Sequence, residues 1–360
     1  MRWGALVLIG LAASACAVSP VAAPPAGVSR SSAGAAPASG FPGQPGDVPY
    51  PTKDWPRGEW PAGTNRTAVD RVVDEAFAGG ADKRVRGVAI VHHGRLIYER
   101  YSANPLDGAD ENMPSFSVAK SITSAAVGIL VHQGKLTVTA PAGAPEWPAG
   151  DPRAAITLDD LLRMSSGLEW NEDTDIAAST GTHDAAKFVA ERKLTHPPGT
   201  NFHYCTGCTF IVDRAMATAL GGGARFTEFI KADLFGKLGM SVTLSYDDQG
   251  TWLGGYAAYA RTLDYAKFGL LFLRDGIWDG QRILPPHWVD YSRTPSRTNA
   301  QYGSGWWLDP QLPGTFFAVG ARGQVIGVDP GHDLTFVITS TDAGRSKPVS
   351  DVIMSVFASG

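Results

Sequence analysis

The chain has 360 residues, a hydrophobic content of 44% and a formal net charge of −4, with no block of lysine or arginine. That much apolar sequence can bury one large core or two joined subdomains. The mild negative charge, without a basic block, gives no sign of the basic surface that binds nucleic acids or acidic membrane faces. We therefore expect a globular protein with a small-molecule ligand and no nucleic-acid partner.

Residues 1–16 have the pattern of an export signal, in which Arg2 is the only charge and small residues precede Cys16. Their apolar stretch is shorter than the roughly 20 residues that cross a bilayer. A cysteine at this place resembles that of bacterial lipoprotein signals, where it is lipidated; an ordinary cleaved signal is the alternative. The expected location is the bacterial cell envelope, through a lipid anchor on Cys16 and otherwise periplasmic or secreted.

Residues 17–61 are dominated by Ala, Pro, Gly and Ser, which cannot bury enough surface to offset their ordering entropy. They are predicted to form a disordered tether, followed by a folded body at residues 62–360. The body begins with apolar residues at helical spacing over 67–77.

Two β-rich runs, 87–91 and 96–101, flank a short polar segment and predict a β-hairpin. His92 and His93 lie in that segment without a third ligand at metal-binding spacing, so no metal site is expected. Helical patterns dominate the middle of the chain, and strands return over 305–339 before a last helix at 349–357. The predicted fold class is α/β (α+β), an antiparallel sheet flanked by helices with a mostly helical subdomain inserted at about 137–260.

Ser117 and Lys120 stand three residues apart at the start of an apolar helix that is predicted to run from residue 117 to about 136. This spacing places both side chains on one helix face. A serine hydroxyl needs an adjacent base to become a nucleophile, and a buried lysine with a lowered pKa can supply it. The alternative is a helix cap at Ser117 with Lys120 turned outward to solvent.

Five segments then resemble, in order, the serine β-lactamase and penicillin-binding-protein superfamily, in particular its class C-like esterases and 6-aminohexanoate-dimer hydrolases. These segments read SFSVAKSITSAAVGILVHQGKL (115–136), LLRMSSGLEW (161–170), PPGTNFHY (197–204), YGSGWWL (302–308) and ARGQVIGVDP (321–330). The resemblance implies the β-lactamase/transpeptidase-like fold and an acyl-enzyme on Ser117. It implies no cofactor.

The resemblance also places the family's tyrosine motif on Tyr204, with Thr206 two residues later. In the family this tyrosine transfers protons beside the serine and lysine, whereas a packed aromatic is the alternative for Tyr204. Thr206 carries a hydroxyl where the family often has an amide.

The family's Lys-Thr-Gly motif has no copy here, and the matching position reads Ala321, Arg322 and Gly323, followed by Gln324. The backbone N–H groups of Ser117 and Gln324 are then the expected oxyanion hole. The missing lysine disfavours β-lactam hydrolysis, unless Arg322 replaces it toward a substrate carboxylate. We expect carboxylic esters or simple amides as substrates.

Cys205 and Cys208 form a Cys-x-x-Cys pair directly after Tyr204. In an exported protein a local disulfide is favoured over two free thiols, and no second pair is present to hold zinc. The expected activity is that of a serine hydrolase. The alternatives are a D-amino-acid peptidase or carboxypeptidase acting on cell-wall peptides and a non-hydrolytic penicillin-binding-type sensor.

Overall fold

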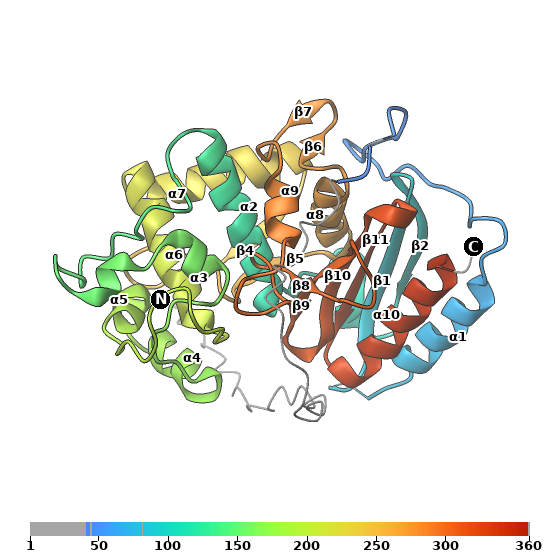
Figure 1. The fold of residues 1–360 in the computed structure, drawn as a ribbon. Helices are drawn as coiled ribbons and strands as arrows, with labels where there is room; N and C mark the ends of the chain where they lie inside the picture. Colours follow the sequence, from blue (N-terminus) through green and yellow to red (C-terminus); the bar gives the residue numbers. More distant parts are fainter. Residues whose placement is uncertain (1–40, 44, 81, 359–360) are drawn as a thin grey trace, which may run out of the picture.

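The computed structural model of the chain describes residues 41–43, 45–80 and 82–358 (Figure 1). The predicted signal peptide and Cys16 lie outside these residues. Within the described part, no helix has both the length and the apolar character needed to cross a membrane.

A six-stranded antiparallel sheet organises one half of the molecule, in the order β2-β1-β11-β10-β9-β8. The predicted hairpin is confirmed: β1 and β2 turn at His93 and Gly94, both with positive φ. The C-terminal strands complete the sheet beside it. The bounds are β1 (Val85–His92), β2 (Arg95–Tyr101), β8 (Trp307–Leu308), β9 (Phe316–Gly320), β10 (Gln324–Asp329) and β11 (Leu334–Ser340).

Helices cover both faces of this sheet. The two helices α1 (Arg66–Phe77) and α10 (Ala343–Ala358) pack side by side on its outer face in Figure 1. The helix α8 (Thr262–Leu273) packs against β1, β10 and β11 from the opposite side. Apolar side chains of α1, α10 and the sheet form one buried cluster, which includes Val69, Val73, Val88, Ile338 and Ile353.

The other half is mostly helical, as predicted, and lies on the left of Figure 1. The helix α3 begins with the capping box of Thr157 and Asp160 that its sequence indicates. Two short helices, α4 and α9, were not expected. The bounds are α2 (Ala119–His132), α3 (Leu158–Leu162), α4 (Glu172–Thr180), α5 (Ala185–Ala190), α6 (Thr206–Leu220), α7 (Gly223–Phe229) and α9 (Trp288–Arg293).

Short strands lie between and beside these helices. A three-stranded sheet has the order β3-β5-β4, and β6 pairs with β7 in a separate hairpin. Their bounds are β3 (Met113–Pro114), β4 (Val242–Leu244), β5 (Ala258–Ala260), β6 (Ile277–Trp278) and β7 (Gln281–Arg282). The inserted-subdomain limits of about 137–260 stay a prediction.

The predicted tether ends earlier than residue 61, because the described residues before that point pack on the body. Tyr50 stacks edge-on against Trp278, with ring centroids 5.3 Å apart. Trp60 packs at 5.8 Å from both Tyr98 and Phe357. Aromatic anchors bury large apolar areas, so they hold a segment whose Pro and Gly content alone indicates disorder.

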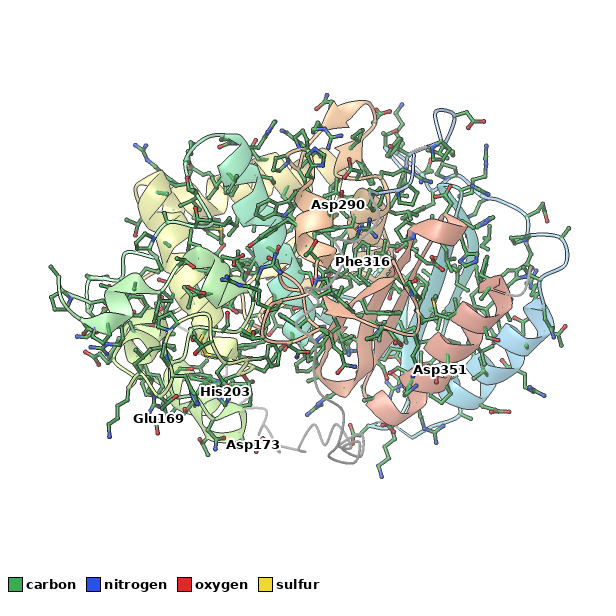
Figure 2. The ribbon with its side chains drawn as sticks, in the orientation of Figure 1. Glu169, Asp173, His203, Asp290, Phe316 and Asp351 are labelled. Atoms are coloured by element: carbon green, nitrogen blue, oxygen red, sulfur yellow. A yellow bond between two sulfur atoms is a disulfide. The ribbon has the colours of Figure 1, made fainter. Side chains whose placement is uncertain are left out.

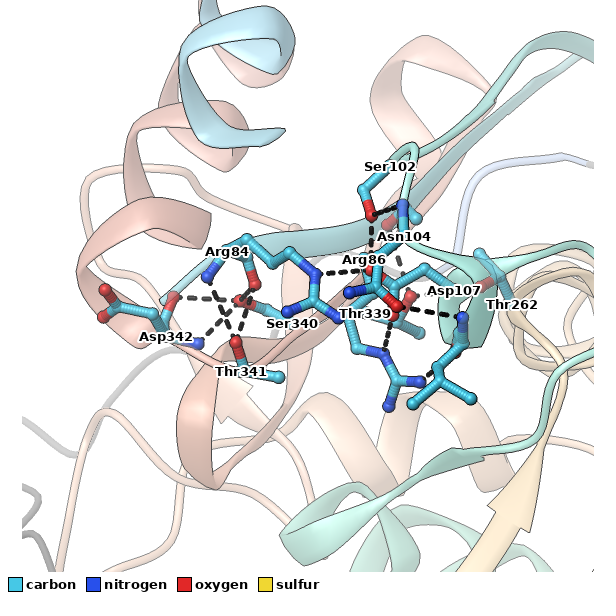
Figure 3. A network of polar contacts seen from close by, with 12 residues as sticks. Arg84, Arg86, Ser102, Asn104, Asp107, Thr262, Thr339, Ser340, Thr341 and Asp342 are labelled. Carbon is cyan, nitrogen blue, oxygen red and sulfur yellow. Dashed lines mark hydrogen bonds and ion pairs between the residues drawn. The ribbon is translucent and has the colours of Figure 1, made fainter. Parts of the chain in front are cut away.

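A buried carboxylate, that of Asp107, joins the segment after β2 to the arginines at the start of β1 (Figure 3). Asp107 is fully buried and accepts hydrogen bonds from Arg84 Nε at 2.5 Å and Arg86 Nε at 2.6 Å, and another from the Ser102 hydroxyl. Burial alone would raise the pKa of Asp107, but these hydrogen bonds from Arg84, Ser102 and Arg86 outweigh it and lower that pKa.

Replacing Asp107 by asparagine should lower the free energy of unfolding by about 3–5 kcal/mol at pH 7, because the buried guanidinium of Arg84 and the partly buried guanidinium of Arg86 lose their anion. The carboxylate's contribution is present above its unfolded pKa of about 3.9 and is lost as pH falls through the lower folded value. The difference between the two proteins should therefore shrink toward pH 3. Urea unfolding at both pH values measures it.

The matched control is Asp74→Asn, which removes an exposed carboxylate that pairs with Arg100 at 2.7 Å. Exposed pairs of this kind contribute about 0–1 kcal/mol. Equal losses for the two variants would contradict the structural role assigned to Asp107.

Candidate active site

The nucleophile candidate Ser117 lies in a 3-10 turn, Phe116–Val118, that leads directly into α2. Phe116 has φ 44°, a left-handed conformation that non-glycine residues adopt at a cost and that clusters at functional sites. The turn is held on β5 because Ser115 N donates to Ala258 O at 2.8 Å. Ser117 is half-buried, so a substrate can reach it.

Lys120 is 2% exposed, and its ammonium nitrogen has three oxygen neighbours. Lys120 Nζ lies 3.0 Å from Ser117 Oγ, 2.9 Å from Thr206 Oγ1 and 2.6 Å from Gly255 O. The structure thus brings together Ser117 and Lys120 as their spacing indicates. Lys120 points inward in the described structure, and not outward to solvent as in the alternative interpretation.

These three oxygen neighbours differ in whether they can donate a hydrogen bond to Lys120 as well as accept one from it. The Gly255 carbonyl can only accept, and the Thr206 hydroxyl already donates its proton to Glu172 Oε2 at 2.8 Å. Both must therefore accept from Lys120. When Lys120 loses a proton, its two remaining N–H groups stay with these acceptors, and its lone pair faces the Ser117 hydroxyl.

Burial lowers the pKa of Lys120 to about 8, although the nearby carboxyl groups of Glu172 and Asp213 act in the opposite direction. The ordinary lysine value is about 10.4. A lysine with this pKa is present in part as the neutral amine near pH 7, so it can take a proton from Ser117.

Glu172, at the start of α4, is the main site residue that the sequence interpretation missed. Its Oε1 accepts from Trp170 Nε1 at 2.8 Å and from Thr206 N at 2.5 Å. An anion at the first N–H groups of α6 is favourable because the helix dipole is positive there. Glu172 therefore aligns Thr206 and supplies the negative charge next to Lys120.

Tyr204 presents its ring to the same lysine, with Lys120 Nζ 4.9 Å from the ring centroid. Trp307 stacks on Tyr204 at 5.6 Å, and both are half-buried. Figure 2 shows His203 near Glu169 and Asp173 at one end of the helical half; His203 and Glu169 lie on loops, and Asp173 lies in the first turn of α4. A role of Tyr204 in proton transfer stays a prediction.

Cys205 and Cys208 form the expected disulfide, and both are fully buried. Cys205 caps α6, since its sulfur accepts from Cys208 N at 3.0 Å. Thr206 is the first residue of that helix. The disulfide consequently fixes the helix turn that places Thr206 between Lys120 and Glu172.

The C-terminal motif residues occupy the turn between β9 and β10. Arg322 is exposed, with its guanidinium carbon 5.8 Å from the Phe116 ring centroid. A Cβ on Gly323 would come within 2.8 Å of Ala343 in α10. Gln324 is the first residue of the interior strand β10, and its side-chain amide donates to Ser340 O.

Gly320, at the end of β9, is the glycine of this turn that meets the nucleophile segment. A Cβ there would lie 2.4 Å from Ser115 O and 3.2 Å from Phe116 Cβ. Only glycine permits so close an approach. The placement of the family's third motif on Ala321, Arg322 and Gly323, directly after Gly320, stays a prediction.

A second missed group lies behind Lys120. Gly254 and Gly255 form a turn whose second carbonyl accepts from Lys120, and Asp213 of α6 holds its first N–H at 2.9 Å. A Gly-Gly pair after an aspartate-rich turn was the only sequence signal for it, and such pairs are frequent in loops. Among the described residues, no group of three or more His, Cys, Asp or Glu side chains is arranged to hold a metal ion.

The fold and this site define a class of hydrolase, and comparison with known families identifies it. Residues 69–357 match the Beta-lactamase family, so the chain belongs to that family and is a hydrolase of its serine type. The expected fold and enzyme class are confirmed.

Individual relatives agree with this assignment. The chain is 26% identical over 270 residues to the 6-aminohexanoate-dimer hydrolase of Paenarthrobacter ureafaciens, which covers 64% of this chain and 67% of that protein. A penicillin-binding protein homologue from Caulobacter crescentus superimposes with a TM-score of 0.66 at 16% identity, covering 83% of this chain and 99% of the other. EstCE1, a hydrolase with promiscuous acyltransferase activity, has a TM-score of 0.63 at 17% identity, with coverage of 80% and 97%.

Proposed function

We propose that the protein hydrolyses carboxylic esters or simple amides through an acyl-enzyme on Ser117. The observation that carries this proposal is the set of three oxygen contacts that surround Lys120 Nζ. With Thr206 and Gly255 holding its two N–H groups, a neutral Lys120 faces the Ser117 hydroxyl at 3.0 Å. Hydrogen-bond reach between a nucleophile and its base is the first requirement of this chemistry.

In the proposed reaction, Ser117 Oγ attacks the substrate carbonyl carbon while its proton passes to Lys120 Nζ. The tetrahedral intermediate collapses as the bond to the leaving group breaks, and that group receives the proton from Lys120, with Tyr204 as the relay. Water then attacks the acyl-enzyme, releases the acid and restores Ser117. Each proton taken up by the site is returned within one cycle.

The oxyanion of the intermediate needs backbone donors, each contributing about 2.7–4 kcal/mol. Ser117 N is the first. The second was predicted to be Gln324 N, but the close approach of Gly320 to Ser115 and Phe116 favours the residue that follows it, Ala321. A crystal structure of a phosphonate adduct on Ser117 distinguishes them, because the phosphoryl oxygen will lie within about 3.1 Å of one N–H.

The surroundings of Ser117 favour a substrate with an apolar part. The half-buried rings of Tyr204 and Trp307 stand on one side of Lys120, and Arg322 over Phe116 stands beside the nucleophile turn. The relative from Paenarthrobacter is named for a 6-aminohexanoate dimer. These features support small acyl esters and amides as the substrate class.

A labelling experiment tests the proposal. The protein should react with a p-nitrophenyl phosphonate to give a single adduct on Ser117, and should turn over p-nitrophenyl butyrate with an initial burst. Absence of an adduct on Ser117 would overturn the proposal. An adduct without turnover of esters, amides or D-Ala-D-Ala peptides would favour the sensor, and preference for the peptides would favour the carboxypeptidase.

The rate of Ser117 acylation should rise with pH through a midpoint near 8, since burial lowers the pKa of Lys120 to about 8 and only the neutral amine accepts the proton. In Glu172→Gln the midpoint should move to lower pH, because the carboxylate that raises this pKa is gone. Burst kinetics between pH 5.5 and 9.5 measure both. An identical midpoint in the two proteins would contradict the assignment of the limb to Lys120.

We also propose that the protein acts outside the cytoplasm, attached to the cell envelope through Cys16. The disulfide of Cys205 and Cys208 supports an oxidising compartment. Incorporation of a radiolabelled lipid precursor into the wild type, and none into Cys16→Ser, is the expected result. An unlabelled wild-type protein would leave export by an ordinary signal as the explanation.

A further inference from the structure

The carboxyl group of Asp213 is deeply buried, yet no step of the proposed reaction uses it. Asp213 lies on α6, two helical turns after Thr206, and is 1% exposed. Its Oδ2 accepts from Gly254 N at 2.9 Å, and its Oδ1 lies 3.2 Å from Thr123 Oγ1 of α2. A buried carboxyl is costly unless its surroundings compensate for it.

Thr123 closes these contacts into a ring. Its hydroxyl lies 3.4 Å from Gly254 O as well as 3.2 Å from Asp213. If Asp213 carries a proton on Oδ1, that proton goes to Thr123 Oγ1, the Thr123 proton goes to Gly254 O, and Gly254 N donates to Asp213 Oδ2. Each polar atom in this ring then has a partner of the correct kind.

The protonated form agrees with the surroundings of Asp213. Burial raises the pKa of Asp213 well above its ordinary range, against the hydrogen bonds that the ionised form would accept from Gly254 and Thr123 and against the charge of Lys120, while Asp247 acts with burial. Glu172 is the other acidic group near Lys120, and it supplies the negative charge there. When neutral, Asp213 holds the turn without adding charge next to the lysine.

The ring leaves no room for a larger residue in the turn. A Cβ on Gly254 would lie 2.6 Å from both Asp213 Oδ2 and Thr123 Oγ1, and one on Gly255 would lie 2.7 Å from Thr206 O. Both glycines are thus pressed between α2 and α6. The turn can occupy this space in essentially one arrangement, which directs Gly255 O at Lys120 Nζ.

We propose, on the basis of the proposed function, that Asp213 is a positioning residue for Lys120. Together with Thr123 it fixes the Gly254–Gly255 turn, so that the Gly255 carbonyl takes one N–H of Lys120 and leaves its lone pair to face Ser117. The role does not require a negative charge on Asp213. It requires an acceptor for Gly254 N and a donor for Thr123.

The decisive comparison is between Asp213→Asn and Asp213→Leu. An asparagine amide can accept from Gly254 N and donate to Thr123, so we expect an acylation rate within about twofold of wild type, with an unchanged pH midpoint. Leucine can do neither, and the misplaced carbonyl should slow acylation by about 10²-fold. Burst kinetics with p-nitrophenyl acetate give the rate, and the pH profile gives the midpoint.

A second variant keeps the test valid if Asp213→Leu does not fold. Thr123→Val removes the hydroxyl at nearly constant volume and should slow acylation about tenfold through loss of its hydrogen bonds. The matched control is Ser124→Ala, one residue later on α2, whose buried hydroxyl pairs with Ser304 Oγ at 3.1 Å. It should lose similar thermal stability and keep the wild-type acylation rate.

Three outcomes would overturn the inference. The first is that Thr123→Val acylates as fast as wild type. The second is that Asp213→Asn loses as much activity as Asp213→Leu. The third is that the pH midpoint of Asp213→Asn moves to lower pH, as that of Glu172→Gln is expected to do. Phosphonate labelling of the wild-type protein separates this from failure of the proposed function. If wild-type Ser117 is labelled and the variants behave in one of these ways, only the role of Asp213 is wrong.

Discussion

Replacing Ser117 by alanine should reduce kcat for p-nitrophenyl butyrate by about 10⁴–10⁶-fold, the range in which removal of a nucleophile leaves little beyond binding and oxyanion stabilisation. No burst and no phosphonate adduct should remain. The hydroxyl is half-buried and its one described partner is Lys120 Nζ. The variant should therefore fold and keep its thermal stability within a few degrees.

The matched control for this change is Ser121→Ala, one helical turn further along α2. Its hydroxyl is fully buried and donates to Gly305 O at 2.6 Å. We expect Ser121→Ala to lose about 1 kcal/mol of stability and to remain active. Turnover by Ser117→Ala at more than a few per cent of the wild-type rate would show that another residue is the nucleophile.

Lys120→Met should lower kcat by about 10²–10⁴-fold, the contribution expected of a general base. Lys120→Arg should lose nearly as much, because a guanidinium keeps the positive charge but does not release its proton near neutral pH. The pair of variants separates base catalysis from electrostatic attraction. If arginine restored most of the activity, the charge of Lys120, rather than its lone pair, would be the important property.

Lys267 offers a matched control for Lys120. It is also a buried lysine, 8% exposed, and its ammonium donates to Gly239 O at 2.5 Å. It lies on α8, and its polar partners among the described residues, Gly239 and Asp264, are not residues assigned to the site. Lys267→Met should keep full activity, and a loss equal to that of Lys120→Met would attribute the effect to removal of a buried charge in general.

Much of the fold was predictable because the regular elements carry clear apolar periodicity. The hairpin, the C-terminal strands and the helices around Val69 and Ile122 follow this pattern. The helix α4 does not, since the only residue buried along it is Ser179. The tether was predicted to be too long because composition conceals single aromatic anchors such as Trp60.

Some residues of the site were likewise predictable from the sequence, and others were not. Ser117 and Lys120 were predictable because one helix turn brings them together, and Tyr204 follows from the resemblance. Glu172 and Asp213 could not be found so, because their roles depend on contacts across 34 residues to Thr206 and 41 residues to Gly254. A carboxylate in sequence carries no sign of its tertiary partners.

The position of β1 between β2 and β11 has a consequence for how the chain reaches its active state. Val88 pairs with Ile338, so the centre of the sheet joins segments at opposite ends of the body. Such non-local pairing forms slowly, because a long loop must close at a cost in entropy before the contacts between the strands can stabilise it. A nascent or truncated chain without β11 exposes the edge of β1 to other chains. Since β9 also contacts the Ser117 turn through Gly320, hydrolytic activity should arise only after the last strands have been synthesised and docked.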